Sequence, residues 1–354
     1  METRLLGRSG LQVSALSFGT MTFGGVGLTA AMGNTNEVEA ERLVGRCIDA
    51  GINLFDTADV YSMGRSEEIL GVALGKKRQD VLVATKAFAM MGPGPNQLGL
   101  SRKHLISACE ASLKRLNTDY VDLYQAHSFD ALTPLDETLR AFEDLVRSGK
   151  VRYIGCSNLG GWQLMKALSV ADQLKTDRYV SQQIYYSALD RDAEWDLVPL
   201  GLDQGVGMLV YGPLASGLLS GKYRRGVAAP EQARAVLLQV PQDRDRERLY
   251  KIVDLLDAIA KERDASISQI AINYVRAKPC VSSVIIGARN EAQLEDNLRS
   301  DGWNLTPEEI RRIDEATEQP LPYPYWHQNA RSGMRNPYYR DLLVKKPKPI
   351  GSKP

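Results

Sequence analysis

Short apolar runs alternate with longer segments of helical periodicity along most of the chain. The runs are nearly continuous in apolar residues, which predicts a parallel sheet covered by helices on its outer face. Eight such runs lie at Ala15–Gly19, Ile52–Asp56, Val81–Lys86, Val121–His127, Val151–Ser157, Val180–Tyr185, Val206–Tyr211 and Val281–Gly287. Eight strand–helix units indicate an α/β protein with a closed (β/α)8 TIM barrel rather than an open sheet.

The segments between the runs carry apolar residues at every third or fourth position, which predicts amphipathic helices. They lie at Glu37–Ala50, from Ser66 onward, and at Arg102–Leu116, Leu135–Ser148, Gly161–Gln173, Trp195–Gln204, Leu249–Arg263, Ser268–Ala277, Glu291–Leu298 and Pro307–Glu318. Gly51 and Gly149 are expected to stop two of these helices, and Ser66 is expected to cap another.

Three further features complete the predicted architecture. Two short apolar stretches flank Gly7-Arg8-Ser9-Gly10, which predicts an N-terminal β-hairpin over the bottom of the barrel. Long loops follow the first strand, at Thr22–Thr35, and the seventh, at Gly212–Asp245. Loops of this length are usually functional or disordered. We therefore expect one barrel domain over residues 1–318 and a partly disordered C-terminal tail over residues 319–354.

Composition excludes several classes of protein. The formal net charge is +1, which argues against nucleic acid or an anionic membrane surface as the main partner. No apolar run approaches the roughly 20 residues of a membrane helix, and the first residues have no apolar signal segment. The cysteines are scattered and predict reduced thiols in a cytoplasmic protein, not a zinc site or a disulfide framework. They are Cys47, Cys109, Cys156 and Cys280.

Polar residues stand where successive predicted strands end. Asp56, Lys86 and His127 close the second, third and fourth strands, and Tyr61 follows five residues after Asp56. In a TIM barrel, the carboxyl ends of the strands carry the active site. The alternative is that each residue is separately structural, as a salt bridge at the barrel mouth and a packed tyrosine.

Together these side chains suit the reduction of a carbonyl group. A free tyrosine titrates near ~10, and a nearby ammonium lowers that value. Asp56 would keep Lys86 charged and in place, and His127 can hydrogen-bond the same substrate oxygen as Tyr61. The group would polarise a carbonyl and protonate the oxygen as hydride arrives.

Hydride must come from a cofactor, and the sequence lacks a convincing dinucleotide fingerprint of the Rossmann type. The chain's three histidines are not in metal-ligand spacing, so no metal is expected, and no serine-hydrolase motif is present. A phosphate site is predicted instead after the eighth strand, where barrels often bind phosphate. Its candidate residues are Gly287, Ala288, Arg289, Gln293, Asp296 and Asn297. Arg289 taken alone is equally consistent with a solvated surface arginine.

Two more groups complete the predicted cofactor site. A loop after the seventh strand is expected to wrap a pyrophosphate, through Gly212, Pro213, Leu214, Ala215, Ser216, Gly217 and Lys222. Ser157, Asn158 and Gln183 offer a hydroxyl and two amides suited to a carboxamide, and Tyr211 offers an aromatic face for a nicotinamide.

Four segments carry a resemblance to a known family. They are Gly51–Tyr61, Leu113–Leu116 with Tyr120–His127, Gly149–Asn158, and the segment from Ile285 to Asn297. In these segments the chain resembles the aldo-keto reductase superfamily, over roughly Leu5 to Thr317. The resemblance implies a (β/α)8 barrel that binds NADPH or NADP+ without a Rossmann fold.

The resemblance also implies roles for individual residues. Tyr61 looks like the general acid of a tetrad with Asp56, Lys86 and His127. Gly19, Thr20 and Met21 match the loop beside the nicotinamide ribose. Arg289 matches the position that faces the adenosine 2′-phosphate, which favours NADPH over NADH. Asp296 stands where several relatives carry Glu.

The tail segment Tyr323–Gln328 resembles a bacterial branch that is similar in broad outline to potassium-channel β-subunits. A regulatory, nucleotide-binding subunit with little turnover is therefore an alternative. Those relatives commonly carry Asn at the position of His127, so His127 favours an enzyme that reduces aldehydes or ketones. Oxidation of alcohols with NADP+ uses the same residues and stays open.

The substrate is the least specified part of the prediction. Phe23, Phe88, Met90 and Met91 are expected to wall the pocket, and Tyr325 and Trp326 either close its top or pack on the barrel exterior. An aromatic and Met-lined pocket suits apolar or bulky carbonyls. The helices of the outer ring can pack against a second copy, so a homo-oligomer stays open.

Overall fold

The computed structural model describes residues 1–227 and 245–335. Within them, eight parallel strands close into a barrel in the order β10-β3-β4-β5-β6-β7-β8-β9. The strands are β3 (Leu16–Gly19), β4 (Leu54–Asp56), β5 (Leu82–Ala87), β6 (Val121–Ala126), β7 (Val151–Ser157), β8 (Ser181–Tyr185), β9 (Gly207–Tyr211) and β10 (Val281–Ile286). The predicted (β/α)8 barrel is confirmed, and each strand lies within an apolar run or one residue from it.

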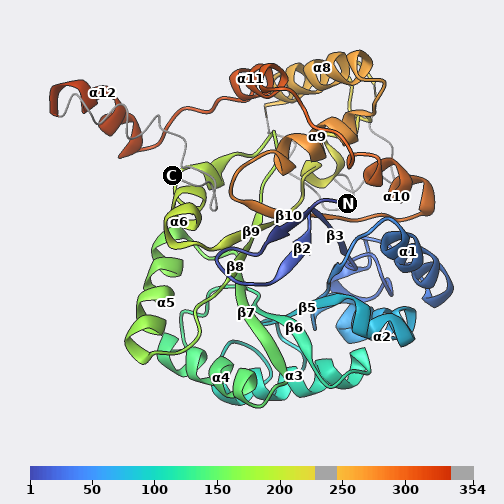
Figure 1. Cartoon of the computed structure of the whole chain (residues 1–354), viewed down its shortest axis with the longest axis vertical. Coiled ribbons are helices and arrows are strands. Elements are labelled where there is room, and N and C mark those ends of the chain that lie inside the picture. Colours follow the sequence, from blue (N-terminus) through green and yellow to red (C-terminus); the bar gives the residue numbers. More distant parts are fainter. Residues whose placement is uncertain (228–244, 336–354) are drawn as a thin grey trace.

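Helices surround the barrel (Figure 1). They are α1 (Glu37–Asp49), α2 (Arg65–Leu74), α3 (Arg102–Leu116), α4 (Leu135–Arg147), α5 (Gly161–Leu174), α6 (Leu197–Gln204), α8 (Arg246–Glu262), α9 (Ile267–Arg276), α10 (Glu291–Leu298) and α11 (Pro307–Ala316). One more helix, α12 (Tyr325–Arg335), follows in the C-terminal region. None of the helices in the described ranges is both long and apolar enough to cross a membrane.

The predicted cap of the second helix is wrong. Helix α2 begins at Arg65, directly after Gly64, which adopts a φ of 90°. Gly64 reaches this left-handed conformation without steric cost, so the chain enters the helix earlier than Ser66. The Ser66 hydroxyl is inside the helix and donates instead to the carbonyl of Thr20, at 2.8 Å.

The predicted hairpin closes the N-terminal end of the barrel. Its strands β1 (Thr3–Leu5) and β2 (Gln12–Ser14) pair antiparallel. Gly7 has a φ of +61°, and a Cβ there would lie 2.5 Å from the carbonyl oxygens of Val180 and Gly205. Because Val180 and Gly205 lie just before β8 and β9, the hairpin turn is pressed against the start of these strands.

The interior of the barrel changes character along its axis. Near the hairpin, Leu54, Leu123 and Leu209 form a buried apolar cluster with Leu6 and Val13. Side chains two residues apart on a strand point to the same side, so Asp56 and Gln125 follow Leu54 and Leu123 into the interior. The barrel is therefore apolar at its bottom and polar toward the carboxyl ends of the strands.

The C-terminal region leaves the barrel after α11. Helix α12 lies to one side of the ring of helices (Figure 1). Residues 336–354 of the tail that was predicted to be partly disordered lie outside the described residues, as does the second half of the predicted long loop, at residues 228–244.

Candidate active site

An ion pair at the carboxyl end of the barrel holds the site together. Lys86 donates hydrogen bonds from Nζ to Asp56 Oδ2 at 2.6 Å, to the carbonyl of Thr57 at 2.8 Å and to Tyr61 Oη at 3.3 Å. The Lys86 side chain is fully buried, and Asp56 is 2% exposed. A buried ammonium is tolerated only when its donors are satisfied, and here three acceptors satisfy it.

Tyr61 is carried by a tight turn between β4 and α2. Ser62 and Met63 follow it with φ values of 49° and 54°, and Ser62 Oγ donates to the carbonyl of Phe23 at 2.7 Å. These contacts fasten the turn to the loop after β3. The Tyr61 phenol is thereby directed at Lys86.

His127 lies one residue past the end of β6. Its ring stands edge-on to the ring of Tyr61, with the centroids 5.8 Å apart. Asn158, just after β7, donates from Nδ2 to the backbone carbonyl of His127 at 3.1 Å. The structure therefore brings Asp56, Tyr61, Lys86 and His127 together at the barrel mouth.

The electrostatics assign different protonation states to these groups. Burial raises the pKa of Tyr61, and the Lys86 charge offsets part of this rise. Burial disfavours the charge on Lys86, yet Asp56 and Tyr61 outweigh it and hold the pKa of Lys86 above its ordinary value. Burial, with Lys86 nearby, lowers the pKa of His127 to about 3. At neutral pH the site thus holds a protonated phenol, an ammonium and a neutral imidazole.

Two glutamines that border this group extend it. Gln183 donates from Nε2 to Asp56 Oδ1 at 2.8 Å, and Gln125 donates to the same oxygen at 3.2 Å. Gln183 was expected among the carboxamide ligands, and the structure adds this contact with Asp56. Gln125 was not predicted, although its position two residues before His127 on the same strand is a signal that could have found it.

The other residues predicted for a carboxamide lie beside His127. Asn158 Oδ1 accepts a hydrogen bond from Tyr211 Oη at 2.8 Å, and Ser157 Oγ donates to the carbonyl of Gln183 at 3.1 Å. The Tyr211 ring rests against Tyr185, with the centroids 5.5 Å apart. A hydroxyl, an amide and an aromatic ring therefore line one side of the barrel mouth.

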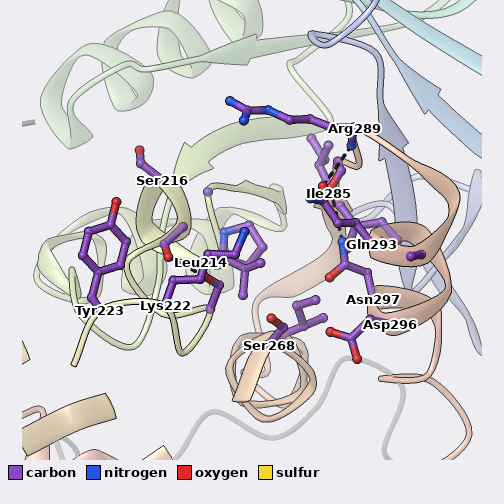
Figure 2. A pocket seen from close by; sticks show the side chains of 18 residues that line it. Leu214, Ser216, Lys222, Tyr223, Ser268, Ile285, Arg289, Gln293, Asp296 and Asn297 are labelled. Atoms are coloured by element: carbon purple, nitrogen blue, oxygen red, sulfur yellow. Dashed lines mark hydrogen bonds between the residues drawn. The ribbon is translucent and has the colours of Figure 1, made fainter. Parts of the chain in front are cut away.

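A cavity of about 410 Å³ opens between the loop after β9 and the start of α10 (Figure 2). Its predicted lining residues are Gly212, Pro213, Leu214, Ser216, Gly217, Lys222, Gly287, Arg289, Gln293, Asp296 and Asn297. Residues not predicted also line it, namely Ser220, Tyr223, Ser268, Ile272, Ile285, Ile286 and Ala292. Ala215 and Ala288, which were also predicted to bind the cofactor, do not line the cavity, and their side chains are 0% and 1% exposed.

Hydrogen bonds order the polar wall of this cavity. Asp296 accepts from Ser266 Oγ at 2.9 Å and from Gln269 Nε2 at 2.7 Å. Arg289 donates from Nε to the carbonyl of Met32 at 3.0 Å, which ties it to the loop after β3. Asn297 donates to the carbonyl of Gly287 at 3.2 Å. The wall therefore offers preformed polar groups and a cation at the start of a helix, where phosphate groups bind readily.

The predicted ribose loop joins the tetrad to this cavity. A Cβ on Gly19 would lie 2.8 Å from Ile285 Cγ2, so a larger residue here would force Ile285 to move. Thr20 is fully buried, and its backbone N–H donates to the carbonyl of Asp56 at 2.9 Å. Met21 is half-buried beside it. Thr20 thus holds the backbone of Asp56, one of the four tetrad residues, in place.

Comparison with known proteins agrees with the geometry. The model of the aldo/keto reductase family matches residues 15–318, which is most of the chain. The chain belongs to the aldo/keto reductase family. The predicted resemblance is thereby confirmed. In the described residues of this aldo/keto reductase, no group of three or more His, Cys, Asp or Glu side chains is placed to hold a metal ion.

Its relatives include both channel subunits and oxidoreductases. A probable voltage-gated potassium channel subunit beta from Arabidopsis thaliana is 40% identical over 85% of this chain and 91% of its own length. The uncharacterized oxidoreductase YrpG from Bacillus subtilis is 38% identical over 90% of this chain and 97% of its own length. Versiconal hemiacetal acetate reductase from Aspergillus parasiticus is 32% identical over 89% of this chain and 96% of its own length.

The residues predicted to wall a substrate pocket divide into two groups. Phe88 and Met91 are half-buried in the loop after β5, and Met90 is 63% exposed there. Phe23 is a correction, because its side chain is fully buried against Phe18, with ring centroids 6.0 Å apart. The loop after β3 directs Phe23 into the core, where burial of an aromatic ring is favourable.

The tail aromatics do not reach the tetrad in this structure. Tyr325 is half-buried, and Trp326 is 51% exposed and packs on the rings of Tyr323 and His327. Helix α12, which carries both, lies to one side of the barrel (Figure 1). The rings of Tyr323, Trp326 and His327 contact one another.

An aromatic pair that was not predicted stands at the barrel mouth instead. Phe129 follows His127 by two residues, and Trp162 follows Asn158 by four. Their rings meet edge to face with centroids 5.7 Å apart, and Trp162 is 66% exposed. Only the folded barrel brings the segment after β6 and the start of α5 together, so the sequence carries no local signal for the pair.

Proposed function

We propose that this protein is an NADPH-dependent carbonyl reductase that converts aldehydes or ketones reversibly to alcohols, with Tyr61 as the proton donor. The observation that carries the proposal is the buried Lys86, which contacts Asp56 at 2.6 Å and Tyr61 at 3.3 Å. A protonated phenol beside a fixed ammonium is suited to donate its proton to a nascent alkoxide.

The residues act on the carbonyl oxygen in a defined order. NADPH, when bound, would provide the hydride for the carbonyl carbon. The neutral His127 imidazole donates a hydrogen bond to the carbonyl oxygen and orients it toward Tyr61. Tyr61 transfers its proton as negative charge builds on that oxygen, and Lys86 stabilises the phenolate that remains. The same residues run the reverse reaction, so oxidation of alcohols with NADP+ is covered by the same mechanism.

The cavity between β9 and α10 supports NADPH as the cofactor. Backbone amides of the Gly212–Gly217 loop and the start of α10 suit a pyrophosphate, and Lys222 adds a positive charge. Arg289 lines the same cavity and suits the adenosine 2′-phosphate, which only NADPH carries. The four cysteines are buried free thiols, which supports a reducing, cytoplasmic setting.

The walls of the mouth support an apolar or bulky carbonyl as the substrate. The Phe129–Trp162 pair in the segments after β6 and β7, and the half-buried Phe88 and Met91 after β5, offer aromatic and thioether surface. Such surface gains free energy by covering apolar groups of a ligand.

The proposal is tested by following NADPH absorbance with a panel of aromatic aldehydes, α-dicarbonyls and bulky ketones. We expect wild-type protein to consume NADPH with at least one substrate. Tyr61→Phe is expected to lower kcat by about 10² to 10⁴, the usual contribution of a general acid, with NADPH affinity unchanged. Turnover retained by Tyr61→Phe contradicts the role of Tyr61.

A second candidate is a nucleotide-binding regulatory subunit with little turnover. It is favoured by the 40% identity to a probable potassium channel subunit beta. Tight NADPH binding without turnover of any carbonyl or alcohol supports this candidate, whereas Tyr61-dependent turnover supports the reductase.

A further inference from the structure

A polar layer crosses the interior of the barrel directly beneath the tetrad. Asp56 of β4, Gln125 of β6 and Gln183 of β8 point inward at this level, and all three are at most 3% exposed. The inward positions just below, at Leu54 and Leu123, are apolar. Apolar residues usually fill the layers of a barrel, so three buried polar side chains at one level call for a reason.

The two glutamines meet at one oxygen of Asp56. Gln183 Nε2 lies 2.8 Å and Gln125 Nε2 lies 3.2 Å from Oδ1, whereas Lys86 Nζ lies 2.6 Å from Oδ2. An ionised carboxylate only accepts hydrogen bonds, so both amides must turn their NH2 groups toward it. The carboxylate is thus held from β5, β6 and β8 at once.

Gln125 donates to Asp56 but leaves its own amide oxygen without a hydrogen bond among the described residues. This oxygen, Oε1, is buried. A buried acceptor without a partner is destabilising, so packing alone would favour an apolar residue here, as at Leu123. The amide of Gln125 is therefore explained by its donor end, which faces Asp56.

We propose that Gln125 is a positioning residue of the active site, which fixes the Asp56 carboxylate so that Lys86 stays in hydrogen-bond reach of Tyr61. Gln125 touches neither substrate nor cofactor in this role and acts through Asp56 and Lys86. The inference rests on the proposed function, since it concerns the donation of a proton by Tyr61. Preorganised groups of this kind spare the site from rearranging during the reaction.

The test compares two Gln125 variants with a matched control. Gln125→Met keeps the length and shape of the side chain and removes the donor. Gln125→Glu keeps the shape and donates only when the new carboxyl is protonated. Gln182→Met is the control, because Gln182 is also fully buried and also donates one hydrogen bond, from Nε2 to the carbonyl of Leu159 at 2.6 Å. Gln182 alternates with Gln183 on β8 and faces away from the barrel interior.

We expect Gln125→Met to lower kcat about tenfold, the effect of one lost hydrogen bond to a charged group, with KM for NADPH unchanged. Gln182→Met also removes one buried hydrogen bond and is expected to keep the wild-type kcat. The kcat of Gln125→Glu relative to wild type should rise as the pH is lowered from about 8 to about 6, because a buried carboxyl beside Asp56 takes up a proton in that range. The relative kcat of Gln125→Met should not rise.

Three results would overturn the inference. They are a wild-type kcat in Gln125→Met, an equal loss of kcat in Gln182→Met, and a relative kcat of Gln125→Glu that does not change with pH. A wild-type protein without turnover removes the proposed function, and a crystal structure of Gln125→Met then decides the positioning role. A Lys86–Tyr61 distance clearly longer than the present 3.3 Å supports the role, and an unchanged distance refutes it.

Discussion

His127 is predicted to remain neutral throughout the pH range in which the enzyme works. Its pKa falls from an ordinary 6.5 to about 3 because the ring is buried and Lys86 lies nearby. A change of about 3.5 pH units disfavours the imidazolium by about 5 kcal/mol. At pH 6, only about one His127 ring in a thousand carries a second proton. A neutral His127 fits the proposed role of a hydrogen-bond donor to the substrate and not that of its acid.

The lowered pKa of His127 also makes the folded protein less stable as the pH falls. The native pKa of His127 lies below the unfolded value, so the unfolded chain binds a proton first as the pH falls. Stability is then lost progressively below about pH 6.5, and the loss at pH 5 is about 2 kcal/mol. In His127→Asn this contribution is absent, so its free energy of unfolding should fall about 2 kcal/mol less than that of wild type between pH 7 and pH 5.

Two assays check this reasoning. Imidazole NMR signals are assigned by comparison with His127→Asn, which is practical because the chain has three histidines. Urea unfolding at pH 7 and pH 5 gives the difference in stability. A His127 signal that titrates near pH 6.5, or an identical pH dependence in the two proteins, would refute the proposed burial and charge environment of this ring.

Three further predictions concern other parts of the site. Asp59 is fully buried, and burial together with the Glu67 charge raises its pKa to about 8. Because this native pKa lies above the unfolded value, the wild-type protein loses stability as the pH rises. Between pH 5 and pH 8, the free energy of unfolding of Asp59→Asn, measured with urea, should therefore rise by about 4 kcal/mol relative to that of wild type. An equal pH dependence in both proteins contradicts this. Arg289→Ala should weaken NADPH about tenfold or more while NADH binding changes little, since a charge-assisted contact is lost; equal weakening in calorimetry removes the 2′-phosphate assignment. Trp162→Ala should raise KM for bulky aromatic aldehydes several-fold and leave small aldehydes unaffected, whereas Leu132→Ala, an exposed residue of the preceding loop, should change neither KM.

The fold and the tetrad were predictable because their signals are local. Each strand is a short apolar run, and a polar residue such as Lys86 marks its carboxyl end. Once strands are assigned to a barrel, their ends must lie together at one mouth. The predicted cavity residues share this property, since the Gly212–Gly217 loop and the start of α10 both follow strands.

The remaining features depend on contacts between distant segments. Gln125 and Gln183 are 58 positions apart, and only the closed barrel directs both amides to Asp56. Phe23 lies in a loop segment between Thr22 and Gly24, yet in the fold its ring packs on Phe18. Ser66 is a residue type that often caps helices, but the cap position of α2 is taken by Gly64, which has a positive φ. Local patterns do not record such long-range packing.

The central claim is that hydride and a proton from Tyr61 both reach the same carbonyl group. It is tested most directly with NADPH that carries deuterium in place of the transferred hydride, mixed with an aromatic aldehyde and analysed by mass spectrometry. The account predicts an alcohol labelled at the former carbonyl carbon with wild-type protein, and almost none with Tyr61→Phe. Unlabelled alcohol, or equal labelling by Tyr61→Phe, would contradict the account.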